Sequence, residues 1–188
     1  MPTEYILAYH CAPAFAGIKP SNIASCSKRE NPNITVQIKM LNEKLNKNDI
    51  YINVLCECGE RVLLMVYRKQ KLCEYLQRDD IKSFLCDNDY PKEFSLMKYL
   101  AILKSRIYAQ RLMNKEFPHE IGAFLGYPLH DIYGFINHKH QGCLLTGEWK
   151  VYENTEQAKK LCRYNKCRKA VIKRINDGRT LTDLFCIA

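Results

Sequence analysis

The sequence IYINVLCECGERVLLMVYR, residues 50–68, predicts a β-hairpin. Residues 50–56 and 61–68 are rich in β-branched and apolar side chains, which is typical of strands, and Gly59 lies in the short turn between them. Two strands joined in this way pair antiparallel.

Helices are predicted on both sides of this hairpin. Before it, apolar residues recur at helical spacing from Ile34 to Leu45. After it, the same spacing predicts one or two short helices over 70–87 and the longest helix over about 91–115. The remaining expected elements are short helices at 119–125 and 129–137, a strand at 144–152, a basic helix at about 155–176 and a helical turn at 180–183.

The N-terminal segment is expected to run from a strand into a helix. Tyr5–His10 has the apolar character of a short strand, and Pro13 and Gly17 then break regular structure. The following Pro20-Ser21-Asn22 has the residue types that begin helices. Together these elements predict an α+β fold: a single helix-rich domain over 1–188, with a small mixed or antiparallel sheet of about four strands.

Composition indicates a cytoplasmic protein with no membrane partner. No apolar run approaches the roughly 20 residues that cross a bilayer, and the first residues lack the basic start of a signal peptide. In a reducing cytosol the ten cysteines are expected to be free thiols.

The net charge of +9 is concentrated near the C-terminus. Only Glu156 and Asp177 are acidic between 155 and 179. Such a run is the solvated face of a helix, or it binds nucleic acid or an acidic protein partner. The basic residues are Lys159, Lys160, Arg163, Lys166, Arg168, Lys169, Lys173, Arg174 and Arg179.

Three strings of residues together resemble a known bacterial family. They are His10-Cys11-Ala12-Pro13 with Gly17-Ile18-Lys19-Pro20, then residues 117–129 (FPHEIGAFLGYPL), and Trp149-Lys150-Val151-Tyr152. In order and spacing the chain resembles the domain of unknown function 3793 over nearly its whole length. The resemblance implies a cytosolic protein of anaerobic bacteria, and it brings no activity and no catalytic residue.

A reactive thiol at Cys11 is the leading hypothesis for chemistry. A nucleophilic thiol needs a cation, a histidine or a helix N-terminus to lower its pKa. We predict Lys19 as that cation and His119 with Glu120 as the proton-moving pair. His10 is a poor partner, because neighbouring strand residues point to opposite faces. The alternative is that Cys11 is simply buried at a structural corner.

The corner formed by residues 118–137 admits three interpretations. Its spacing of small and apolar residues matches a DNA-reading helix-turn-helix, although Asp131 on its second helix would repel phosphate. It is otherwise a packing corner, or a ligand-binding corner in which Tyr127, Tyr133 and Trp149 line an apolar pocket. For the small-molecule or redox-linked site predicted around Cys11, the ligand-binding residues are Asn22, Tyr127, Trp149 and Tyr152.

Other kinds of site lack support. The spacing of Cys56 with Cys58, and of Cys162 with Cys167, does not match zinc-binding motifs, so we predict no metal. No glycine-rich phosphate loop and no nucleophile elbow is present. The sequence indicates no particular cofactor.

Overall fold

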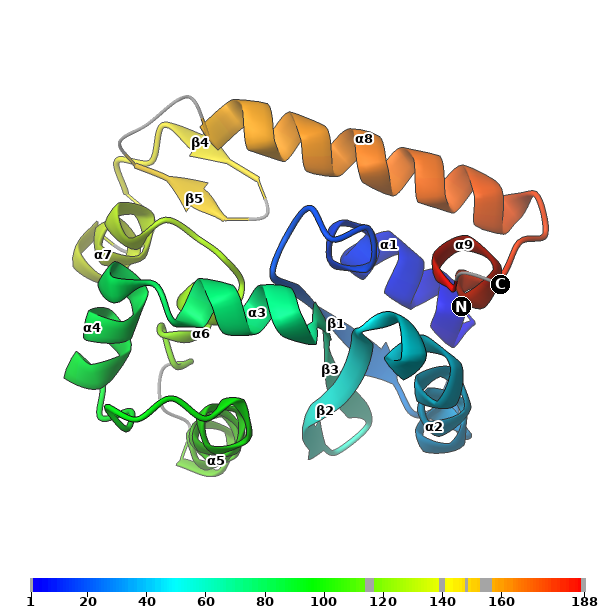
Figure 1. Ribbon diagram of the computed structural model, residues 1–188, viewed down its shortest axis with the longest axis horizontal. Helices are drawn as coiled ribbons and strands as arrows, with labels where there is room; N and C mark the ends of the chain where they lie inside the picture. The colour runs from blue at the N-terminus through cyan, green and yellow to red at the C-terminus, as the bar shows by residue number, and fades with distance from the viewer. Residues whose placement is uncertain (1, 114–116, 139–140, 148, 153–156, 187–188) are drawn as a thin grey trace.

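The predicted hairpin is confirmed and forms the centre of the protein. The computed structural model describes residues 2–113, 117–138, 141–147, 149–152 and 157–186. Three antiparallel strands lie in the order β1-β3-β2 (Figure 1). They are β1 (Ser21–Ser27), β2 (Ile50–Cys58) and β3 (Arg61–Arg68). Gly59 in the turn has a φ of 53°, a left-handed conformation that favours glycine.

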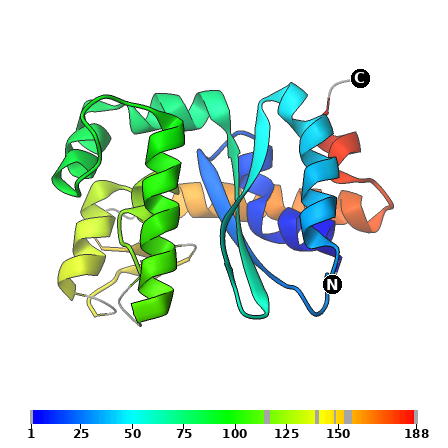
Figure 2. The same ribbon diagram turned by 90° about the horizontal axis from the view of Figure 1, so that it is seen from below.

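The central strand β3 is covered on both faces, which explains its nearly unbroken apolar sequence. Val62, Leu64 and Val66 belong to one core cluster, and the alternating Leu63 and Met65 belong to another. Figure 2 shows the consequence, a sheet with helices on either side. The alternation of side chains along a strand therefore divides the core into two halves.

The first half packs the two ends of the chain together. Its buried residues come from one face of the sheet and from α1, α2, α8 and α9. The elements on this side are α1 (Thr3–Phe15), α2 (Ile34–Leu45) with the short 3-10 helix η1 (Asn46–Asn48), α8 (Gln157–Asn176) and α9 (Leu181–Phe185). Thr180 and Asp183 form a capping box at the start of α9, as expected for a helix beginning there.

The second half contains the middle of the chain. Its helices are α3 (Lys69–Leu76), α4 (Asp79–Asp87), α5 (Leu96–Met113), α6 (Ile121–Phe124) and α7 (Leu129–His138). A small antiparallel ladder, β4 (Leu145–Thr146) with β5 (Lys150–Val151), lies beyond α7. The helix-rich α+β prediction with a small antiparallel sheet is thus confirmed.

The prediction for the N-terminal segment was wrong, because helix and strand come in the opposite order. Residues 3–15 form helix α1 and residues 21–27 form strand β1. Pro13 lies inside α1, so the carbonyl of Tyr9 lacks its usual helical donor. Arg168 of α8 donates to that carbonyl at 2.7 Å, and the Asn22 side chain accepts from the Ala14 N–H at 3.1 Å.

Two other predictions need correction. The expected strand at 144–152 is the two-stranded ladder β4–β5, in which Gly147 N–H donates to the Trp149 carbonyl at 3.0 Å. The expected longest helix begins later, at Leu96, and within the described residues it runs as α5 to Met113. Residues 114–116 and 153–156 lie outside the described part of the chain. None of the described helices is long and apolar enough to cross a membrane.

Candidate ligand-binding pocket

A pocket of about 570 Å³ opens between the α6–α7 corner and the β4–β5 ladder. Most of its wall is apolar, with polar side chains at a few points. The apolar side chains are Phe117, Pro118, Ile121, Tyr127, Ile132, Phe135, Ile136 and Trp149. The polar ones are His119, Asp131, Thr146 and Lys150, and Gly122 and Gly147 complete the lining.

The carboxylate of Asp131 fixes this wall. Asp131 lies in the first turn of α7 and is only 2% exposed. One of its oxygens accepts from the indole Nε1 of Trp149 and the other from the backbone N–H of Tyr152, each at 2.8 Å. Hydrogen bonds to an ionised acceptor are stronger than neutral ones, so Asp131 ties the ladder firmly to α7. Sequence reasoning missed this role.

An aromatic cluster forms part of this wall. Trp149 stacks on Tyr127 with ring centroids 5.0 Å apart, and Tyr164 of α8 lies 6.3 Å from Trp149. The ammonium of Lys19, which is 1% exposed, lies 5.0 Å from the Tyr127 ring centroid and 5.6 Å from that of Tyr164. A cation over aromatic rings is stabilised by their negative faces. Lys19 therefore stabilises the aromatic cluster.

Glycines allow the corner to pack this closely. Gly126 has a φ of +72°, and a Cβ at this position would stand 2.7 Å from Cδ of Pro20. A Cβ on Gly134 would stand 2.6 Å from the ring of Tyr152. The string of residues 117–129 is thus explained by packing: Gly126 brings the corner against the start of β1, where the Ser21 hydroxyl also donates to the Phe124 carbonyl at 2.8 Å.

The predicted ligand-binding residues are spread over several places. Tyr127 and Trp149 line the pocket. Tyr152 lines a second hollow of about 530 Å³, together with His130 and His138. Asn22 is 4% exposed and holds the backbone of Ala14, so it belongs to the packing between α1 and β1.

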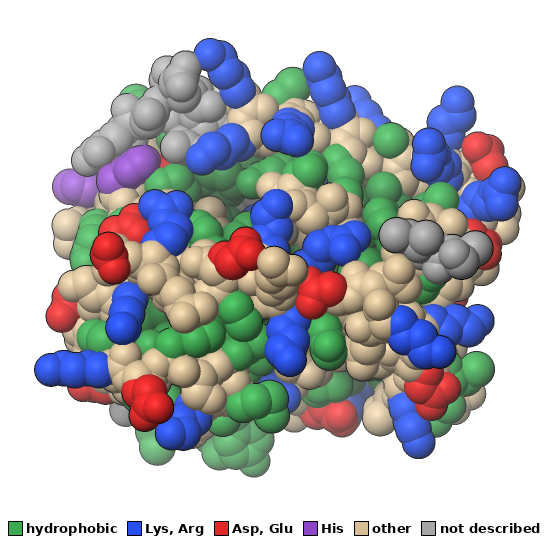
Figure 3. All heavy atoms as spheres, in the orientation of Figure 1, with side chains coloured by type: hydrophobic (Ala, Val, Ile, Leu, Met, Phe, Trp, Pro, Cys, Tyr) green, Lys and Arg blue, Asp and Glu red, His purple; other side chains and the backbone are tan. Residues whose placement is uncertain are grey.

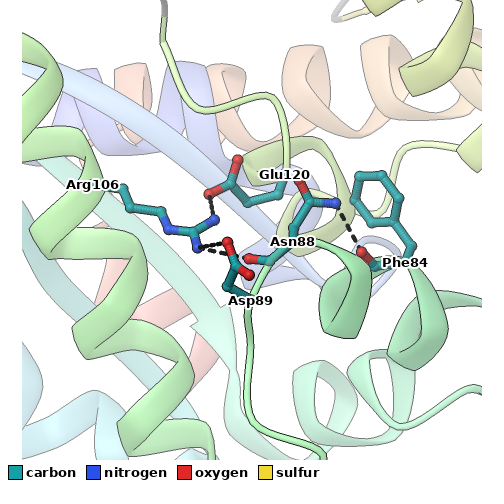
Figure 4. Close-up of polar contacts among 5 residues, drawn as sticks. All are labelled: Phe84, Asn88, Asp89, Arg106 and Glu120. Atoms are coloured by element: carbon teal, nitrogen blue, oxygen red, sulfur yellow. Dashed lines mark hydrogen bonds and ion pairs between the residues drawn. The ribbon is translucent and has the colours of Figure 1, made fainter.

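His119 and Glu120 are neighbours in sequence, but they face different surroundings. His119 lines the pocket, with its ring against the edge of Phe135 at 5.5 Å. Glu120 is 5% exposed and pairs with Arg106 of α5 at 2.7 Å (Figure 4). Arg106 also donates to the Asn88 carbonyl at 2.6 Å. Glu120 therefore joins α5 to the start of α6.

The pKa of Arg106 reflects this pairing. Burial alone would lower it, but the hydrogen bond and the charge of Glu120 outweigh burial, and the pKa is raised above its ordinary value. The pair thus connects α5 with the start of α6 in the folded protein.

Cys11 lies away from the pocket. Its side chain is 0% exposed and belongs to the core half formed by α1, the sheet and α8, whereas the pocket is lined from the α6–α7 corner and the β4–β5 ladder. Of the four predicted catalytic residues, His119 is the one that lines the pocket. The reactive role of Cys11 stays a prediction. Among the described residues there is no group of three metal-ligating side chains.

One side of the α6–α7 corner forms a wall of the pocket. Helix α6 is a single turn of four residues, and α7 turns Asp131 inward toward Trp149. The interpretation of this corner as a DNA-reading helix-turn-helix stays a prediction. In this protein the α7 side chains Ile132, Phe135 and Ile136 line the cavity.

Fold and pocket define the protein as a helix-rich α+β protein with a three-stranded antiparallel sheet and an aromatic-walled cavity between the α6–α7 corner and the β4–β5 ladder. The chain belongs to the family described as protein of unknown function (DUF3793), whose family model matches residues 7–185. The resemblance seen in the three sequence strings is confirmed over nearly the whole chain. The comparisons with curated proteins and with solved structures found no match.

Proposed function

We propose that this protein binds a small, planar and mostly apolar molecule in the pocket between the α6–α7 corner and the β4–β5 ladder. The volume of about 570 Å³ falls within the range of small-molecule sites. Such sites combine an apolar wall with a few placed polar groups, which is the composition found here. The observation that carries the proposal is the wall itself, a Trp149–Tyr127 stack held by the buried Asp131.

The chemistry of the wall restricts the ligand. A stacked indole and phenol favour a flat, unsaturated partner, because aromatic rings pack best in offset or edge contacts. Both oxygens of Asp131 already accept hydrogen bonds from the protein. Polar recognition of the ligand is therefore assigned to His119, Thr146 and Lys150. The proposal concerns binding and makes no use of Cys11, which lies in the other half of the core.

Two dyes of similar shape test the proposal. Anilinonaphthalene sulfonate is aromatic and anionic, and phenylnaphthylamine is its neutral analogue. We expect at least one of them to bind saturably with a stoichiometry of one. Energy transfer from Trp149, the only tryptophan of the chain, then reports that the dye lies near Trp149. Comparison of the two dyes measures the contribution of a negative charge on the ligand.

A matched pair of variants shows whether the dye occupies this pocket. Phe135 and Phe94 are both half-buried and each has an edge-on ring contact, and of the two it is Phe135 that lines the pocket. Phe135→Ala should weaken dye binding about tenfold or more, since a buried phenyl contact is worth roughly 1.5–3 kcal/mol. Phe94→Ala should leave it nearly unchanged. Equal loss in the two variants, or no saturable binding of either dye, would contradict the proposal.

A further inference from the structure

Helix α8 carries almost the whole net charge of the protein. Between Gln157 and Asn176 the sequence has eight basic residues and no acidic one, against a net charge of +9 for the chain. Seven of the eight are exposed, and we call them the α8 basic face: Lys159, Lys160, Arg163, Lys166, Lys169, Lys173 and Arg174. The eighth, Arg168, is used inside the protein, where it donates to the carbonyl of Tyr9.

The basic face is one continuous surface. At 3.6 residues per turn its seven members spread over roughly half of the helix circumference. The opposite half is covered: Leu161 and Tyr164 pack in the aromatic cluster, and Val171 packs on the core of α1 and the sheet. Figure 3 shows Lys and Arg side chains gathered along α8 at the top of the molecule. From Lys159 to Arg174, this surface therefore presents positive charge over about 22 Å.

Two properties of the face indicate the kind of partner. First, the apolar side of α8 is already buried in the protein, so the helix has no apolar face to insert into a lipid surface. Second, the exposed residues between the cations are small or polar, namely Cys162, Asn165 and Ala170. Protein–protein interfaces are depleted in Lys and depend on aromatic anchors in their centre. The α8 basic face lacks such anchors, so we expect its binding interactions to come from its charge.

We propose that the α8 basic face binds the phosphodiester backbone of nucleic acid without reading the base sequence. Phosphate contacts from Lys and Arg supply most of the affinity of non-specific binding. The cations of the face span about 22 Å, which is roughly two-thirds of one turn of duplex, about 34 Å long. The five Lys of the face act as mobile point charges rather than as base-reading groups, which suits contact with a uniform backbone.

Salt dependence measures the number of contacts. A labelled 20-base-pair duplex is titrated with the full-length protein at several salt concentrations, with fluorescence anisotropy as the readout. If about five cations each neutralise one phosphate, the logarithm of the binding constant falls with the logarithm of salt with a slope of about −4 to −5. A slope close to zero, or no binding at low salt, would overturn the proposal.

Charge-matched variants assign the contact to α8. The variant Arg163→Gln, Lys166→Gln, Lys173→Gln removes three cations from the α8 basic face. A control variant removes three exposed cations from elsewhere, by Lys39→Gln, Lys92→Gln and Lys98→Gln. The α8 variant should bind the duplex at least tenfold more weakly and reduce the salt slope by about 3, while the control stays within about threefold of the parent. Equal weakening in the two variants would refute the assignment.

Competition distinguishes nucleic acid from an acidic protein. Polyglutamate, at the same concentration of negative charge as the duplex, serves as the acidic polypeptide probe. The proposal expects it to displace the duplex poorly. Displacement as effective as that by unlabelled duplex would overturn the proposal in favour of an acidic protein partner, and a more than tenfold preference between two duplexes of different sequence would overturn the non-specific mode.

Discussion

Replacing Gly126 with alanine should destabilise the protein by about 2–5 kcal/mol. Gly126 has a φ of +72°, and a side chain in this left-handed conformation costs about 1–2 kcal/mol. The new Cβ would also stand 2.7 Å from Cδ and 2.9 Å from Cγ of Pro20. These atoms belong to a rigid ring, so the backbone must move, and crowding of this kind costs about 1–3 kcal/mol more.

Gly178 provides the matched control for this substitution. Its φ of +86° is also left-handed, but no atom lies within 4 Å of where its Cβ would stand. The stability change of Gly178→Ala therefore includes the cost of the left-handed conformation and the effect of reduced conformational freedom in the unfolded chain, but it does not include a close contact. The difference between the two variants isolates the contact with Pro20, at about 1–3 kcal/mol.

Urea-induced unfolding measures both variants, followed by circular dichroism and by the fluorescence of Trp149. We expect the midpoint to fall for both, further for Gly126→Ala, with an unchanged dependence on urea concentration. If the two variants lose the same stability within 0.5 kcal/mol or so, which is near the error of such comparisons, the close approach of the α6–α7 corner to the start of β1 is refuted.

Three further outcomes are expected. Asp131→Ala should cost about 2–4 kcal/mol and shift Trp149 emission to the red, because the buried indole loses its charged acceptor; unchanged emission would contradict the tie between them. Burial raises the pKa of Tyr67 to about 12, so the unfolded chain ionises near pH 10 before the native one does. The contribution of Tyr67 to the free energy of unfolding is fully present below pH 10 and is lost between pH 10 and 12. Tyr67→Phe should therefore lose less free energy of unfolding than the parent over this pH range, as measured by unfolding experiments. Iodoacetamide should label Cys162 rapidly in the native protein and Cys11 only after unfolding, which peptide mass mapping detects; similar rates at both thiols would disprove the burial of Cys11.

The parts of the fold that were predictable are those set by local sequence. The apolar run of residues 61–68 and the turn glycine at 59 define the hairpin without help from distant residues. The helical spacing from Ile34 to Leu45 defines α2 in the same way. In each case the side chains that are buried follow the period of the element itself.

The segment of residues 3–27 was not predictable in this way, because its structure depends on distant partners. Pro13 reads as a break, and it is accommodated in α1 because Arg168 supplies a donor to the exposed carbonyl of Tyr9. Strand β1 is short of β-branched residues, and it forms because β3 offers an edge for pairing. Neither Arg168 nor the free edge of β3 leaves any mark on residues 3–27.

The candidate site also has parts that the local sequence predicted and parts that depend on distant residues. Aromatic residues near turn glycines suggested a ligand-binding corner, and the structure places Tyr127 and Trp149 in one wall. The role of Asp131 carried no signal, because an acidic residue in the first turn of a helix is ordinary wherever it faces solvent. That Glu120 would meet Arg106 instead of serving His119 also depends on how α5 packs, which the local sequence does not contain.

Because α1 packs against α8, the N-terminal helix cannot be fully buried until the C-terminal part of the chain has been synthesised. Arg168 reaches Tyr9 across 159 residues, and Glu4 accepts from the Leu181 N–H across 177. At roughly 5–20 residues per second, the ribosome delivers Arg168 about 8–32 s after Tyr9. Throughout that interval, part of the apolar surface of α1, which includes Leu7 and Phe15, is not yet covered by α8 and α9. The emerging chain must therefore be shielded from association with other chains until its last helices have left the ribosome.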